Sequence, residues 1–139
     1  MNMKYILLIC CICILSVLTW KYFLDETLPA EFAAKQAQQQ NPFVIEADSA
    51  AVVWQRAKDF LQERRRLIAG GALQQNDSLL YIPYYTNYHK GNSIMIEKKN
   101  LGDSVQVTCR WWYSKQEQAD GGKEIALYMQ TGISRYDYK

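Results

Sequence analysis

Histidine is nearly absent from this sequence, which has a single one, His89, among its 139 residues. Zinc sites in proteins normally take three or four His, Cys or carboxylate ligands, so an ordinary His-based zinc site cannot be assembled within one chain. A nucleophile–base pair of Cys109 and His89 would have to join a strand residue to a loop residue. We therefore expect no metal, no cofactor and no catalytic residue, and we interpret the protein as non-catalytic.

An excess of charge of one sign is also missing, because 16 Lys and Arg stand against 14 Asp and Glu, a net charge of +2. This balance gives no field that would attract nucleic acid or an acidic membrane surface. No glycine-rich phosphate loop follows a predicted strand, since Gly70 and Gly71 follow a predicted helix instead. Nucleic acid is therefore not an expected partner, and no small-molecule ligand is indicated.

One long hydrophobic run is present, KYILLICCICILSVLTWKYFL at residues 4–24. Twenty helical residues rise about 30 Å, the thickness of the hydrocarbon core of a bilayer. Lys4 and Lys21 would then lie near the two interfaces, together with aromatic side chains. The run predicts a transmembrane helix over residues 5–24, as an anchor or signal-anchor at residues 1–24.

Two alternatives to an uncleaved anchor remain open. A cleavable signal peptide needs small residues at alternate positions before the cut, but Glu31 and Phe32 occupy such positions. A bacterial lipoprotein signal needs a small residue directly before the modified cysteine, whereas Cys10, Cys11 and Cys13 follow Ile, Cys and Ile. We expect a single-pass protein of the bacterial inner membrane, with its C-terminal domain in the periplasm.

Residues 25–42, DETLPAEFAAKQAQQQNP, are polar and rich in Ala and Gln. Pro29 suits the first turn of a helix and Pro42 can end one, so part of this segment can be helical. We expect a polar spacer that gives the domain reach. The remaining residues, 43–139, are enough for one small α+β extracytoplasmic domain with one core.

The clearest element is an amphipathic helix within residues 46–71. Asp48 or Ser49 can accept hydrogen bonds from its first amides, and Gly70 is typical of a helix end. Apolar residues recur there at spacings of three and four, which predicts one stripe facing the core. The stripe consists of Val53, Trp54, Ala57, Phe60, Leu61, Leu67 and Ile68.

Downstream, apolar residues alternate, which predicts three strands. Residues 78–85 are expected at a sheet edge, because Pro83 has no N–H to donate. Residues 92–100 and 103–113 are expected to form a hairpin. With a short helix at 123–132, this predicts an α+β two-layer fold that has one long helix, a three-stranded antiparallel sheet and a short C-terminal helix. The alternative is a helix packed on a four- or five-stranded meander.

Alternation within the last predicted strand places neighbouring side chains on opposite faces. The odd-numbered residues from Val105 to Tyr113 are expected to face the core, which makes Cys109 a packed and inert residue. Arg110 and Trp112 would lie on the face that no predicted helix covers, unless Trp112 packs under the spacer. Aromatic residues and arginine carry much of the energy at protein interfaces, so this face is a predicted protein-binding surface. Its candidate residues are Arg110, Trp112, Tyr81, Tyr85 and Tyr88.

These observations favour a membrane-anchored envelope protein whose periplasmic domain binds another envelope protein, as an assembly component, adaptor or inhibitor. The alternative is a small periplasmic enzyme or glycan-binding protein that uses the loop Tyr84–His89 with Asp77 or His89. A pocket that holds His89 or two close carboxylates would favour the alternative. A flat aromatic sheet face would favour protein binding.

Overall fold

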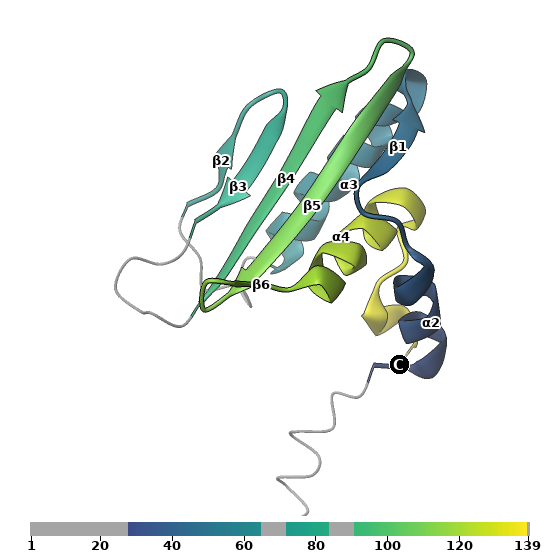
Figure 1. Cartoon of the computed structure of the whole chain (residues 1–139), viewed down its shortest axis with the longest axis vertical. Coiled ribbons are helices and arrows are strands. Elements are labelled where there is room, and N and C mark those ends of the chain that lie inside the picture. Colours follow the sequence, from purple (N-terminus) through teal and green to yellow (C-terminus); the bar gives the residue numbers. More distant parts are fainter. Residues whose placement is uncertain (1–27, 65–71, 84–90, 139) are drawn as a thin grey trace, which may run out of the picture.

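The computed structural model describes residues 28–64, 72–83 and 91–138 (Figure 1). The expected transmembrane helix over residues 5–24 lies outside them, as do Tyr85, Tyr88 and His89. Among the described residues, no helix combines the length and the apolar character that crossing a bilayer requires.

The centre of the fold is an antiparallel sheet of six strands, which confirms the α+β class. The order across the sheet is β1-β5-β4-β3-β2, and β6 pairs with the end of β5. The expected three-stranded sheet is wrong, because three strands of only two to four residues were missed. The strands are β1 (Phe43–Glu46), β2 (Gln74–Gln75), β3 (Leu79–Ile82), β4 (Asn92–Asn100), β5 (Ser104–Tyr113) and β6 (Gln116–Glu117).

The two longest strands, β4 and β5, form the predicted hairpin. Ile96 lies opposite Cys109, and this register extends along both strands. The hairpin closes where the Leu101 N–H donates to the Ser104 carbonyl at 2.9 Å. Gly102 sits in this turn with a φ of +92°, a conformation that residues with a Cβ rarely adopt.

The strand before Pro83 is not at the sheet edge, contrary to prediction. Leu80 of β3 pairs with Ile96 of β4 on one side and with Gln75 of β2 on the other. Pro83 follows the last residue of β3 and lies outside the ladder, so its missing N–H breaks no strand pairing.

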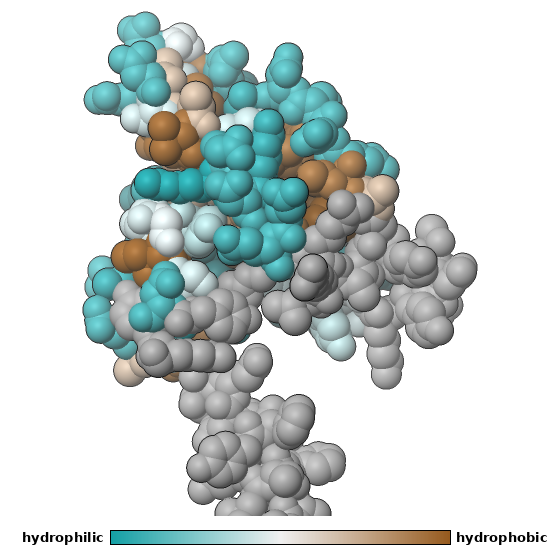
Figure 2. Space-filling model, turned by 180° about the vertical axis from the view of Figure 1, so that it is seen from behind, coloured by the Kyte–Doolittle hydropathy of each residue, from teal (hydrophilic) through white to brown (hydrophobic). Residues whose placement is uncertain are grey.

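Three α-helices occur in the described residues: α2 (Ala30–Gln38), α3 (Ala50–Arg64) and α4 (Ala119–Thr131). A short 3-10 turn, Ala47–Ser49, leads from β1 into α3. In Figure 1, α3 lies behind the sheet. Helix α4 lies on the β5 side of the sheet, and α2 lies farther out on that same side. Helix α4 confirms the predicted C-terminal helix, although it begins at Ala119, and Gly132 ends it in the left-handed conformation. Figure 2 shows the helix side, where most of the described surface is hydrophilic.

The core lies between the sheet and helices α3 and α4. The described part of the predicted α3 stripe is fully or almost fully buried, which confirms the helix face expected from its spacing. Its residues pack against the inward side chains of the sheet and against Ile125, Ala126 and Met129 of α4. Each large aliphatic or aromatic side chain buried in this way contributes about 1.5 to 3 kcal/mol to folding.

Helix α2 lies inside the expected spacer and packs against α4. Phe32 is fully buried, and Gln36 is 5% exposed. The Gln36 side-chain amide donates to the Asp120 carbonyl at the start of α4, at 2.6 Å. Residues 30–38 therefore form part of the folded domain.

The start of α4 approaches β5 closely because it carries Gly121 and Gly122. A Cβ on Gly122 would lie 2.6 Å from the Cys109 carbonyl oxygen and 2.7 Å from Nδ2 of Asn41. A Cβ on Gly121 would lie 2.9 Å from the ring of Trp111. These distances are shorter than packed atoms tolerate, so glycine is needed for this contact.

An ion pair joins the C-terminal 3-10 turn, Arg135–Tyr138, to α4. Glu124 is 1% exposed, and Arg135 donates from Nε to its Oε1 at 2.9 Å and from Nη2 to its Oε2. A buried carboxylate without such a partner would be strongly destabilising. The pair therefore holds the end of the described chain against the domain.

Candidate functional site

The predicted binding residues that the structure describes lie on the side of the sheet opposite its buried core side chains. Tyr81, Met95 and Arg110 lie directly across from one another on β3, β4 and β5. Ser93 and Trp112 form the neighbouring row. Directly opposed residues have Cβ atoms about 4.5 to 5.5 Å apart, so these five side chains lie on one side of the sheet, here called the open face. Ser93 is the buried member of this set, with 1% of its surface exposed.

The strand register that places Trp112 on the open face is confirmed by burial. Val105, Val107 and Cys109 are all at most 5% exposed on the opposite side of β5. Trp111 packs against the core, and its indole Nε1 donates to Oδ1 of Asn92 at 2.8 Å. Tyr113 is the exception among the expected core residues, because it ends the strand and is 50% exposed.

A shallow depression of about 290 Å³ lies on the open face, lined by Tyr81, Ser93, Met95, Trp112 and Lys115. The Ser93 hydroxyl donates to the Ile82 carbonyl at 2.8 Å, so it serves the fold itself. The other lining groups are two aromatic rings, a thioether and an ammonium group. Aromatic and methionine side chains offer large and adaptable apolar contact areas.

The turn from β5 to β6 places Lys115 beside this depression. Ser114 and Lys115 both have positive φ, 49° and 68°, between the paired residues Tyr113 and Gln116. Two consecutive positive φ values characterise the type I′ hairpin turn, which favours Asn-Gly because other residues are strained there. The sequence Ser-Lys instead retains a cationic side chain at the rim of the open face.

The described part of the spacer, residues 28–42, does not cover Trp112. Helix α2 bonds to the start of α4, and the Asn41 side chain bonds to the edge of β5. None of these residues lines the depression at Trp112. The loop that includes Tyr85, Tyr88 and His89 lies outside the described residues.

Cys109 is packed, as predicted. It is 1% exposed, and its Sγ lies 3.6 Å from Sδ of Met129. Burial raises the pKa of the Cys109 thiol far above its ordinary value, because the thiolate would lose its hydration. The described residues contain no cluster of three His, Cys, Asp or Glu side chains suited to hold a metal ion.

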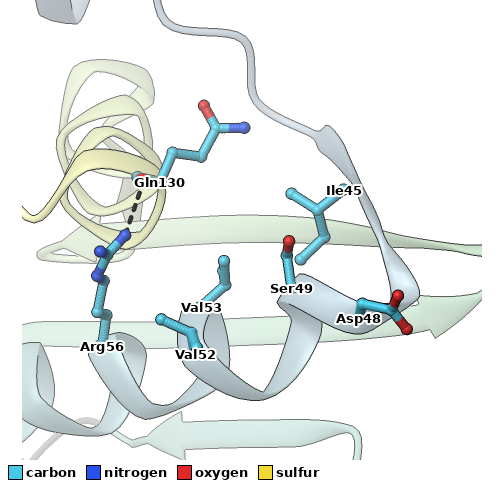
Figure 3. Close-up of a pocket in the computed structure, with 7 residues that line it drawn as sticks. All are labelled: Ile45, Asp48, Ser49, Val52, Val53, Arg56 and Gln130. Carbon is cyan, nitrogen blue, oxygen red and sulfur yellow. Dashed lines mark hydrogen bonds between the residues drawn. The ribbon is translucent and has the colours of Figure 1, made fainter.

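A second concavity, of about 460 Å³, lies where β1, the start of α3 and the end of α4 meet (Figure 3). Sequence reasoning missed it because it missed β1. The short run FVIE has three apolar residues in succession, so it shows no apolar–polar alternation that would have indicated a strand. The groove is lined by Ile45, Asp48, Ser49, Val52, Val53, Arg56 and Gln130.

Comparisons with protein-family models, with curated proteins and with solved structures find no match for this chain. A functional assignment therefore depends on the chemistry of its own surfaces.

Proposed function

We propose that the protein is a membrane-anchored, non-catalytic bacterial envelope protein whose periplasmic domain binds another envelope protein through the open face. It would act as an assembly component, adaptor or inhibitor. The observation that carries this proposal is the grouping of Tyr81, Arg110 and Trp112 on a sheet face that the three described helices leave uncovered. Tyr, Trp and Arg are the residue types most enriched at energetically important interface positions.

The shape of the open face supports a protein partner over a small molecule. Pockets for small ligands usually enclose about 300 to 1,000 Å³ and bury most of the ligand. The depression at Trp112 has about 290 Å³ and lies on a sheet surface. It is suited to one or two side chains of a larger partner, with Arg110 exposed nearby to pair with an acidic group.

The hydrophobic run over residues 5–24 supports the anchor, and helix α2 limits how far the domain extends from it. Helix α2 begins at Ala30, so residues 25–29 alone would link the span to the domain. Five extended residues reach about 17 Å. The domain would therefore stay near the bilayer, and its partner would be a membrane protein or a protein held close to the membrane.

The test is partner capture with the full-length protein from detergent-solubilised membranes, with the captured proteins identified by mass spectrometry. Trp112→Ala and Arg110→Ala should each reduce capture of the same partner at least tenfold, because central Trp and Arg residues carry much of the binding energy. Thr108→Ala is the matched control, since Thr108 lies on the same strand and faces the same side. Equal capture by all three variants would contradict the proposal.

The alternative, an enzyme or glycan-binding protein that uses the loop Tyr84–His89, gives a different result in this experiment. Binding would survive Trp112→Ala and would be lost in His89→Ala. A separate intact-mass measurement on membrane-extracted protein tests the anchor. The mass should include residues 1–24 without lipid on Cys10 or Cys11, whereas a shorter chain or an added diacylglycerol would contradict the anchor.

A further inference from the structure

Strand β1 forms one edge of the sheet, and its outer side has no strand partner among the described residues. Ile45 lies opposite Val105, and the Ala47 N–H donates to the Asp103 carbonyl at 3.1 Å. In an antiparallel pair, alternate residues bond to the partner strand. The backbone N–H and C=O of Val44 and the N–H of Glu46 therefore point away from β5.

Elsewhere the chain covers the edge of β5 with its own groups. The Asn41 side chain bonds to Cys109 beyond the end of β1, and the Gln118 N–H donates to the Trp111 carbonyl at 2.7 Å. Uncovered strand edges readily pair with other chains, and proteins normally block them. Among the described residues, the outer edge of β1 thus differs from the neighbouring edge of β5, which the chain covers.

The groove in Figure 3 lies where the inward side chains of an added strand would fall. Neighbouring strands are about 4.8 Å apart, and inward side chains continue the row across the sheet. Ile45 is the inward residue of β1 at this point, and the groove beyond it is floored by Val52 and Val53 of α3. Val52 is 57% exposed, so α3 presents apolar surface beyond the last strand of the sheet.

Two charged side chains, Asp48 and Arg56, line this groove. Glu46, Asp48 and Asp103 are exposed where β1 ends, and Figure 3 shows Asp48 at the opposite end of the groove from Arg56. The Arg56 guanidinium already donates to the carbonyls of Met129 and Gln130, at 3.1 and 2.8 Å. The occupant that complements this end is therefore cationic.

We propose that the edge of β1 binds an extended segment of a partner protein by β-strand addition. The segment places an aliphatic side chain in the groove at Val52 and Val53, and a Lys or Arg near Glu46 and Asp48. Its backbone pairs with Val44 and Glu46, which supplies affinity, while the groove and the acidic end supply specificity. This site lies apart from the open face and does not depend on the function proposed for that face.

The test presents the full-length chain in lipid nanodiscs to a displayed library of random twelve-residue peptides. Enriched peptides should alternate aliphatic residues and carry Lys or Arg. They should also slow hydrogen exchange in residues 43–46. Val52→Lys should weaken their binding at least tenfold, and Ala51→Lys, at an exposed neighbour outside the groove, less than twofold.

Two further variants distinguish strand addition at β1 from binding at the open face. Val44→Pro removes an outward N–H and should also weaken binding at least tenfold, whereas Trp112→Ala should leave it unchanged. Val52→Lys alone decides the matter if Val44→Pro does not fold. The proposal is overturned if no peptide is enriched above empty nanodiscs, or if binding responds to Trp112→Ala and not to Val52→Lys. If the protein instead dimerises as its concentration rises, and Val52→Lys abolishes this dimerisation, the edge of β1 binds a second copy of the chain.

Discussion

The side chain of Asn41 pairs with the backbone of Cys109 as a strand residue would. Nδ2 donates to the Cys109 carbonyl at 2.6 Å, and Oδ1 accepts from the Cys109 N–H at 2.9 Å. The strand pairing of β1 begins at Phe43, so Asn41 extends the ladder by one pair. One amide group thereby satisfies two backbone groups that lie partly buried beneath the start of α4.

Replacing Asn41 with Ala should lower the free energy of unfolding by about 3 kcal/mol. The change leaves the N–H and C=O of Cys109 without partners, and a buried unsatisfied group costs about 1 to 3 kcal/mol. Urea unfolding followed by tryptophan fluorescence measures the loss. Gln40→Ala, an exposed neighbour, should stay within about 0.5 kcal/mol of the unmodified protein. Equal stability of the two variants would show that this pairing contributes little.

The longer elements could be predicted from the sequence because their periodicity extends over many residues. The α3 stripe and the β4–β5 hairpin follow from such patterns. The C-terminal helix is indicated instead by its helix-forming residues and Gly132, because Ile125, Leu127 and Met129 alternate as they would in a strand. Strand β1 has only four residues and pairs with a strand far along the chain, so no local pattern identifies it. Helix α2 resembles a spacer in sequence because Phe32 and Gln36 are its only buried residues.

The two surfaces differ in how far the sequence could reveal them. Alternation along one strand, from Val105 to Trp112, was enough to place Arg110 and Trp112 on the open face. Met95 joined them only once the pairing of β4 was known. The groove beside β1 needs residues from β1, α3 and α4 together, which is tertiary information that no single pattern contains.

The glycines at the start of α4 should differ in their tolerance of alanine. Gly122→Ala would place its Cβ against the Cys109 carbonyl and the Asn41 amide, both held in the β5 edge. We expect a loss of about 3 kcal/mol, because overpacking forces the backbone to move. Gly121→Ala contacts the ring of Trp111 and gains helix propensity, so its loss should be about 1 kcal/mol. Thermal or urea unfolding of both variants measures the difference, and the reverse order would contradict the close approach at Gly122.

Stability should fall at alkaline pH because of Cys109. Burial raises the pKa of the Cys109 thiol in the folded protein, while the unfolded thiol ionises near its ordinary value of about 8.5. The stability that comes from keeping the Cys109 thiol protonated is thus fully present below about pH 8.5. Above that pH the free energy of unfolding falls by about 1.4 kcal/mol per pH unit. Burial also raises the pKa of Tyr128, helped by the carboxylate of Glu63, which adds to the fall above about pH 10.

The control for this pH dependence is Cys109→Ser, which removes the titrating thiol. It should cost about 1 to 2 kcal/mol at pH 7, since a hydroxyl replaces a thiol in an apolar layer. Between about pH 8.5 and 10 its unfolding free energy should change much less than that of the unmodified protein. An unchanged slope would show that another group causes the alkaline loss. Partner binding should be unaffected, because Cys109 lies on the core side of β5.

The adjacent tryptophans Trp111 and Trp112 test the register and the open face together. Trp111→Ala removes a ring that packs on the core and on Gly121 and leaves Asn92 without its indole donor. We expect it to lose about 3 kcal/mol, a large share of the stability of a domain this small. Trp112 lies on the open face, so Trp112→Ala should lose about 1 kcal/mol or less.

Chemical unfolding of both variants decides between registers, because a shift of one residue moves every side chain of a strand to the other face. If Trp111→Ala is stable and Trp112→Ala unfolds, the open face therefore consists of other residues than those named here. Partner capture adds the functional half of the test. If Trp112→Ala folds and still captures its partner at full strength, the strand register stands but the proposed interface is wrong. The edge of β1 would then be the surface to test next, through Val52→Lys.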